Sequence, residues 1–76
     1  MKKPGDLVVS RSDVACILRN ALELSAINSA EDIPGGIIMI ILEVFNRPGW
    51  DSAPEFRVLL ADGRTGWIRG YACKKL

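Results

Sequence analysis

The chain has 76 residues, enough for one small domain over residues 1–76, with ten basic and nine acidic side chains and a net charge of +1. This balance offers no broad basic surface to nucleic acid and no acidic tail. The absence of His excludes Cys-His and Ser-His-Asp catalysis and removes a common metal ligand. No carboxylate pair or Gly-rich phosphate loop indicates an active site. We therefore predict that the protein is not an enzyme and holds neither metal nor cofactor.

The N-terminal segment bears on the compartment of the protein. Residues 1–3 carry the charge of a signal-peptide start, but residues 4–6 are Pro-Gly-Asp, where an apolar segment would be required. The longest wholly apolar run, residues 37–42, is too short to span a bilayer. We therefore expect a soluble, cytoplasmic protein with no membrane contact. In a reducing cytosol, Cys16 and Cys73 are expected to be small buried hydrophobic side chains, and a disulfide between them is the alternative.

The first predicted element is a strand from residue 6 to about residue 11, with Leu7 and Val9 facing the core. After this strand, Pro and Gly are absent until residue 34. Such a long interval without either residue is unusual for a domain of short strands and tight turns. It favours one continuous element over several short ones.

This interval has the pattern of an amphipathic helix over residues 13–26. Ser12 fits an N-cap and Asp13 fits the first turn of a helix. The apolar residues recur at helical spacing: Val14, Ile17, Leu18, Ala21, Leu22 and Leu24. We therefore predict one helix inside an insertion that spans residues 12–35. A pair of strands is the alternative, because several of the apolar residues are β-branched.

The second predicted strand, residues 36–46, is apolar on both faces. We expect its even-numbered side chains to line the core: Ile38, Ile40, Leu42 and Val44. Its odd-numbered face would be polar if it met water, yet it carries Ile37, Met39, Ile41 and Phe45. This face requires a cover, since an exposed apolar strand promotes aggregation. The cover is either the predicted helix or a second copy of the protein.

A loop over residues 47–54 joins this strand to the next, because it contains Pro48, Gly49 and Pro54. Trp50 lies within this loop. It is either a lid packed on the end of the domain or an exposed anchor for a partner.

Residues 55–71 predict a β-hairpin around an Asp-Gly pair. A three-residue loop over residues 61–63 sets Phe56 opposite Ile68 and gathers the apolar side chains on one face. A two-residue loop would mix apolar and charged side chains, since a one-residue slip turns every side chain to the other face. The longer loop also places its glycine at the left-handed position. We predict this register, with two large side chains on the outer face, Arg57 and Trp67.

Two motifs of the chain resemble a known fold. Residues 66–68 (Gly-Trp-Ile) followed by Tyr71 are similar to the end of a Src-homology-three-type barrel, where such a strand leads through one tight turn into the last strand. Residues 3–9 resemble the Pro-Gly-Asp-hydrophobic opening of small barrels. Over residues 2–11 and 35–76 the chain resembles small, mostly uncharacterised barrel proteins encoded by tailed bacteriophages, notably marine ones. The resemblance implies a Src-homology-three-like barrel of about five strands, here with one inserted helix.

The chain departs from the Src-homology-three domains that bind proline-rich peptides. Phe56 stands in the strand where those domains carry a Trp, and Arg69 with Gly70 replaces a Pro after the Gly-aromatic-Ile segment. The first loop has no Tyr. Of an aromatic groove, only Tyr71 and Trp67 remain, so recognition of proline-rich peptides is not expected.

We therefore expect a non-enzymatic binding and self-assembly module. The resemblance implies a virion component, an assembly factor or a modulator of a host protein, located in the host cytoplasm or the virion. A protein partner is expected to meet four residues: Trp50, Trp67, Tyr71 and Arg57. The surplus of apolar side chains predicts a homo-oligomer with an interface of Ile17, Leu18, Ala21, Leu24, Ile37, Met39, Ile41 and Phe45.

Nucleic-acid binding is the alternative function. The Pro-Gly-Asp opening is also similar to barrels of the ribosome- and transcription-associated KOW type. This function requires the basic residues to converge on one face with an aromatic side chain: Lys2, Lys3, Arg57, Arg64, Arg69, Lys74 and Lys75. The near-neutral charge disfavours it.

Overall fold

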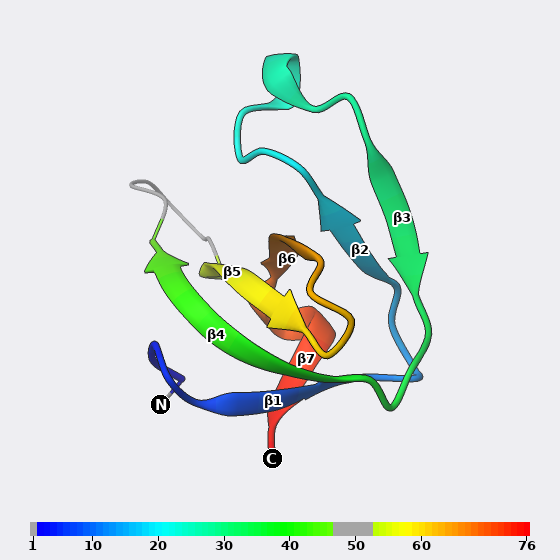
Figure 1. Cartoon of the computed structure of the whole chain (residues 1–76), viewed down its shortest axis with the longest axis vertical. Helices are drawn as coiled ribbons and strands as arrows, with labels where there is room; N and C mark the ends of the chain where they lie inside the picture. The colour runs from blue at the N-terminus through cyan, green and yellow to red at the C-terminus, as the bar shows by residue number, and fades with distance from the viewer. Residues whose placement is uncertain (1, 47–52) are drawn as a thin grey trace.

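A computed structural model describes residues 2–46 and 53–76, and Trp50 with most of the predicted loop lies outside them. The described chain contains short strands and two single-turn 3-10 helices (Figure 1). In chain order these are β1 (Leu7–Ser10), β2 (Cys16–Arg19), η1 (Leu24–Ala26), β3 (Ala30–Ile33), β4 (Ile38–Phe45), β5 (Glu55–Leu60), β6 (Thr65–Arg69), η2 (Gly70–Ala72) and β7 (Cys73–Lys75).

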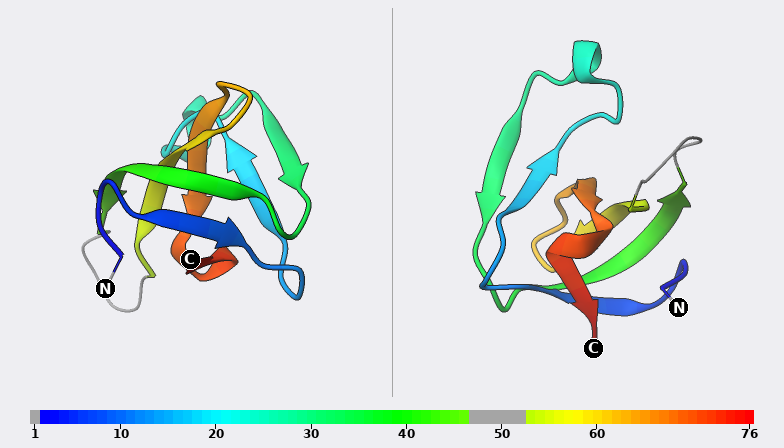
Figure 2. Two further views of the ribbon diagram at one scale, coloured as in Figure 1. Left: turned by 60° about the horizontal axis from the view of Figure 1, so that its bottom comes forward. Right: turned by 180° about the vertical axis from the view of Figure 1, so that it is seen from behind.

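All seven strands belong to one antiparallel sheet in the order β3-β2-β6-β5-β4-β1-β7. The sheet curls around one apolar interior but does not close, because β3 and β7 do not pair (Figures 1 and 2). Both termini lie at the end of the molecule formed by β1 and β7, and η1 lies at the opposite end. The predicted mainly β class is confirmed, whereas the predicted number of about five strands is wrong.

The predicted helix over residues 13–26 is wrong. The interval instead holds β2 and β3, which pair from Cys16 opposite Ile33 to Arg19 opposite Ala30. The long connection between them is closed by Asn20, whose side-chain oxygen accepts the backbone N–H groups of residues 28 and 29. The strand pair considered as the alternative is therefore correct, and the insertion is a β-hairpin with one 3-10 turn.

A contact with β6, which lies much later in the sequence, explains why β2 is an extended strand and not a helix. Arg19 pairs with Trp67 of β6, and Leu18 lies buried against Gly66 of the same strand. A Cβ atom on Gly66 would stand 2.7 Å from Leu18 Cδ1, so only a glycine lets the two strands approach this closely. Pairing with β6 thus overrides the local helical pattern.

The core-facing side of the first strand is the reverse of the prediction. Val8 is buried opposite Met39, whereas Leu7 is exposed. Ser10 is buried as well, and its hydroxyl donates to the Pro34 carbonyl at 2.6 Å and accepts the N–H of Ile37 at 2.9 Å. These two hydrogen bonds satisfy the buried hydroxyl.

In the first half of β4, the face that points to the core is the opposite of the predicted one. Met39 and Ile41 are each 1% exposed and face the core, whereas Ile38 is half exposed. A β-bulge between Ile41 and Glu43 then shifts the register, so that Val44 packs on the core opposite Phe56. The even-numbered face therefore lines the interior only beyond the bulge.

The predicted hairpin register is confirmed. Phe56 pairs with Ile68, and Arg57 pairs with Trp67. The N–H of Leu60 donates to the Arg64 carbonyl across a three-residue loop, in which Gly63 has a φ of +93°. The core joins this hairpin to the other strands and consists of Val8, Cys16, Leu18, Ile33, Met39, Ile41, Phe56, Val58, Leu60, Ile68, Ala72 and Cys73.

Candidate functional site

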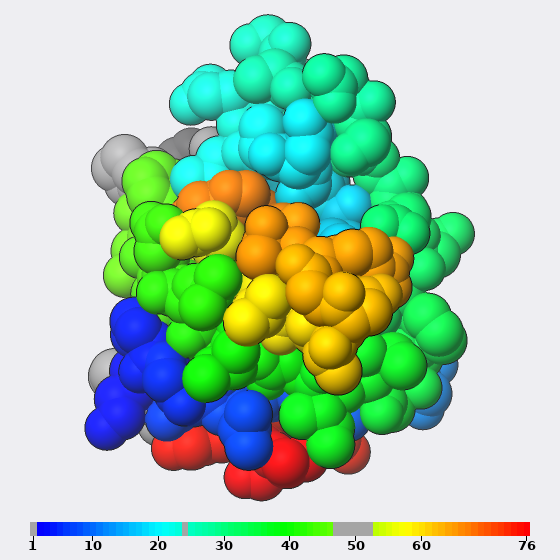
Figure 3. Space-filling view, viewed as in Figure 1, coloured from blue at the N-terminus to red at the C-terminus, as the bar shows by residue number. Residues whose placement is uncertain are grey.

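The outer face of β1, β4 and β5 carries a group of aliphatic side chains. Residues that pair directly across strands share a face, and the register aligns Leu7 with Ile40 and Ile40 with Leu59. Ile38 and Val9 form the neighbouring pair. We call these five residues the aliphatic face. Its surface lies where the three strands meet side by side in Figure 3.

The aliphatic face is open to solvent. Leu7 is 47% exposed and Ile38 is 50% exposed, among the highest values for large apolar side chains in the described residues. A shallow hollow of about 490 Å³ lies along it, with Ala61 at its border. Scattered exposed apolar side chains are ordinary, but a contiguous group on three paired strands indicates an interaction surface.

A second row on the outer face contains charged and aromatic side chains. The register runs from Glu43 through Arg57 and Trp67 to Arg19, across four strands. The Arg57 Nε donates to Glu43 Oε1 at 2.6 Å. The structure thus brings together two of the predicted partner-binding residues, Arg57 and Trp67. Tyr71 lies apart from this row, on η2, where it is 52% exposed.

At the end of this row, Arg19 forms a buried ion pair with Glu55, which the sequence did not predict. The Arg19 Nη2 donates to Glu55 Oε1, and the two side chains are 9% and 1% exposed. The Arg19 Nη1 is buried without a hydrogen-bond partner among the described residues. Arg19 and Glu55 lie 36 residues apart in the sequence, so no local signal indicated that they form a buried pair.

The predicted oligomer interface does not form one surface. Leu18, Met39 and Ile41 are core residues and cannot contact another copy. Ile37 packs against that core. The remaining residues are distributed over the β2–β3 hairpin, η1 and the end of β4: Ile17, Ala21, Leu24 and Phe45. Met39 and Ile41 face the core because the strand parity is reversed before the bulge, and Leu18 faces it because β2 is a strand packed against β6.

The seven basic residues of the alternative function do not converge on one face. Arg57 is paired with Glu43, and Arg64 is paired with Glu31 at 2.6 Å and with Asp62 at 2.7 Å. The backbone N–H and side chain of Arg64 hold the pKa of Asp62 below its ordinary value. Three lysines do lie together at the end of the molecule near the termini: Lys2, Lys3 and Lys75.

The two cysteines are buried free thiols, as predicted. Burial is the main cause that raises the pKa of Cys16 to about 11, with a smaller contribution from Cys73. Burial also raises the pKa of Cys73. Within residues 2–46 and 53–76, no three Cys, Asp or Glu side chains gather as they would around a metal ion.

The chain matches no protein-family model, no curated protein and no solved structure. In the part of the chain that the structure describes, no helix has the length and apolarity needed to cross a membrane. The function is therefore inferred from the surfaces of the protein and from its sequence motifs.

Proposed function

We propose that the protein is a non-enzymatic binding module that self-associates through the aliphatic face. The observation that carries this proposal is the half-exposed pair Leu7 and Ile38 beside Ile40 and Leu59 on three hydrogen-bonded strands. Five aliphatic side chains on a regular sheet present a flat surface that water solvates poorly. A second copy of the same surface matches it in shape and polarity.

A two-fold arrangement makes the contact wholly aliphatic. With the symmetry axis parallel to β4, Leu7 of one copy would lie against the partner's Leu59, because the two residues flank Ile40 on opposite sides. Ile38 and Ile40 would then each meet their own counterparts. Two sheets that stack in this way interdigitate side chains as they do in β-sandwiches.

The expected association is weak to moderate. Full burial of a Leu or Ile contributes about 1.5–3 kcal/mol, so covering the exposed half of Leu7 or Ile38 contributes roughly 1 kcal/mol per side chain. Association also loses translational and rotational freedom, so this gain supports a weak dimer rather than a tight one. The partly exposed Ile40 and Leu59 add to the favourable side. A concentration-dependent equilibrium follows, and it links association to stability.

The Src-homology-three-like arrangement is part of the proposal. It is supported by Gly66, Trp67 and Ile68 on β6, followed by the single turn η2 with Tyr71 and then by β7. The strand order β7-β1-β4-β5-β6 is consistent with a small barrel into which the β2–β3 hairpin is inserted. The family resemblance extends the proposal to a phage-encoded virion component, assembly factor or modulator of a host protein, although a fold alone carries no activity.

Thermal unfolding at several protein concentrations tests the proposed contact. Ile38→Lys places a charge in the aliphatic face, and Tyr71→Lys is the matched control, because Tyr71 has nearly the same exposure but lies on η2. The melting temperature of the wild type and of Tyr71→Lys should rise with concentration. That of Ile38→Lys should stay constant. A wild-type melting temperature that is independent of concentration would count against self-association.

A further inference from the structure

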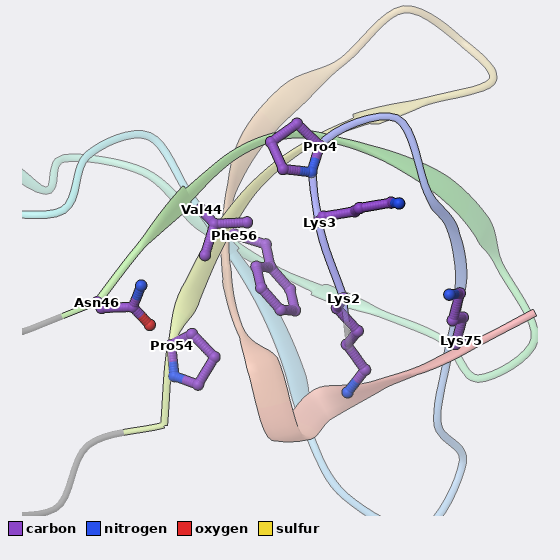
Figure 4. A pocket seen from close by; sticks show the side chains of 8 residues that line it. All are labelled: Lys2, Lys3, Pro4, Val44, Asn46, Pro54, Phe56 and Lys75. Carbon is purple, nitrogen blue, oxygen red and sulfur yellow. The ribbon is translucent and has the colours of Figure 1, made fainter.

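A hollow of about 640 Å³ lies at the end of the molecule near both termini (Figure 4). Its apolar wall is formed by Val44, Pro54 and Phe56, from the end of β4 and the beginning of β5. Its other side is formed by the N-terminal segment and β7, which contribute three lysines: Lys2, Lys3 and Lys75. The volume lies in the range of small-molecule sites, about 300–1,000 Å³.

The lining of this hollow is strongly cationic, although the net charge of the whole chain is only +1. Three of the ten basic side chains lie around it, and none of the described lining residues is acidic. Among the described residues, Asp6 supplies a counter-charge, because its Oδ2 lies 3.5 Å from the Lys75 Nζ. In the part of the chain that the structure describes, the three ammonium groups and this one carboxylate leave a local charge of about +2.

The three ammonium groups differ in how they are held. The Lys2 Nζ donates to the carbonyls of Gly70 and Cys73, at 3.2 and 3.0 Å, which fixes its position and leaves one of its three N–H groups. Lys3 forms no ion pair among the described residues, although its backbone N–H donates to Asp6 Oδ2 at 3.1 Å. One charge is therefore preorganised and a second is free to move toward a ligand.

We propose that this hollow binds a phosphomonoester that carries a compact apolar group. A phosphomonoester has about two negative charges at neutral pH, which match the local charge of the site. Lysine ammonium groups bind phosphate as point charges, whereas recognition of a planar carboxylate favours arginine. The apolar group would lie against Val44 and Pro54.

The burial of the Phe56 ring favours this ligand over a nucleic-acid strand. Binding of single strands depends on aromatic rings whose faces are open for stacking. Phe56 is only 1% exposed, and the Lys2 Nζ lies 5.9 Å from the centre of its ring. The ring supports the wall of the hollow but offers no stacking platform. This favours a small organic phosphate over a chain of bases.

Titration of the full chain with phenyl phosphate, followed by backbone amide chemical shifts, tests the proposal. Saturable shifts should appear at the start of β5, in the N-terminal segment and in β7. O-phosphoserine, which has the same charged head but a polar body, should bind more weakly, and inorganic phosphate should also bind more weakly. Equal binding of all three, or shifts spread over every lysine, would overturn the assigned ligand and leave only general anion attraction.

Two variants test whether the lysines that line the hollow bind the phosphate group. Lys3→Gln with Lys75→Gln should weaken phenyl phosphate binding about tenfold or more, because two charged donors are lost. Lys74→Gln is the matched control, since Lys74 is the exposed neighbour on β7 and does not line the hollow. Equal weakening by both variants, or no saturable binding by the wild type at millimolar ligand, would refute the site. The double variant should leave self-association unchanged, so this test is independent of the proposed function.

Discussion

Gly66 lies so close to Leu18 that a Cβ atom on it would stand 2.7 Å from the Leu18 Cδ1 and 2.8 Å from the Arg19 carbonyl oxygen. This close approach joins β2 to β6 and thereby attaches the β2–β3 hairpin to the rest of the sheet. The hairpin makes no other strand pairing, since β3 is the edge of the sheet.

Gly66→Ala should therefore destabilise the protein. Inserting a methyl group where the neighbours cannot withdraw costs about 1–3 kcal/mol. In a Leu18→Ala background the same substitution should cost less, because one of its two clashes is removed, while the clash with the Arg19 carbonyl persists. Urea unfolding of the four proteins in this cycle measures the coupling. Simple additivity would contradict the contact.

The Arg19–Glu55 pair should behave as a buried pair. Arg19→Met leaves the Glu55 carboxylate buried without this guanidinium and should lower the free energy of unfolding by about 3–5 kcal/mol. Replacing both residues, as Arg19→Met with Glu55→Gln, should restore much of the loss. The control is the exposed pair of Arg57 and Glu43, where Arg57→Met should cost less than about 1 kcal/mol. Equal effects at the two arginines would show that the Arg19 pair is not buried in solution.

The cysteines predict a loss of stability at alkaline pH. The pKa of Cys16 is raised by burial from 9.0 to about 11, so the unfolded chain releases its thiol proton at lower pH than the folded chain. The contribution to stability is therefore complete below pH 9.0 and is lost as the pH rises toward about 11. Cys73 shifts in the same direction. Cys16→Ala should flatten the decline in melting temperature over this range, and an unchanged decline would contradict the shift.

Thiol reactivity provides a second test of the same burial. Both cysteines should react slowly with a disulfide reagent at pH 8 in the folded protein, because the thiolate is the reactive form and both side chains are buried. In urea both should react rapidly. Rapid modification of the folded protein would show that the interior around Cys16 and Cys73 opens readily.

The sequence predicted the hairpin of β5 and β6 but not the β2–β3 hairpin, and the reason is physical. The register of the first hairpin is decided locally, by the face that Phe56 and Ile68 share and by the conformation of Gly63. The spacing of apolar residues over 13–26 fits a helix as well as a strand. Whether this interval forms a helix or strands depends on Gly66, at least forty residues further along the chain.

The aliphatic face and the lysine-lined hollow could not be predicted from the sequence, for related reasons. With apolar residues on both faces of β4, no alternation of polarity indicates which face is buried, and the bulge before Glu43 exchanges the faces midway. The Lys2 and Lys75 side chains lie at opposite ends of the chain. They line the same hollow because the pairing of β1 with β7 brings these two parts of the chain together, a relationship that no local pattern reveals.

Sedimentation equilibrium of the wild-type protein over a wide range of concentrations tests self-association through the aliphatic face most directly. The weight-average mass should rise with concentration from 8.3 kDa toward twice that value. Ile38→Lys should keep the monomer mass, while Tyr71→Lys should follow the wild type. A wild-type mass that stays at 8.3 kDa into the millimolar range would contradict the proposal, as would an Ile38→Lys protein that associates as strongly as the wild type.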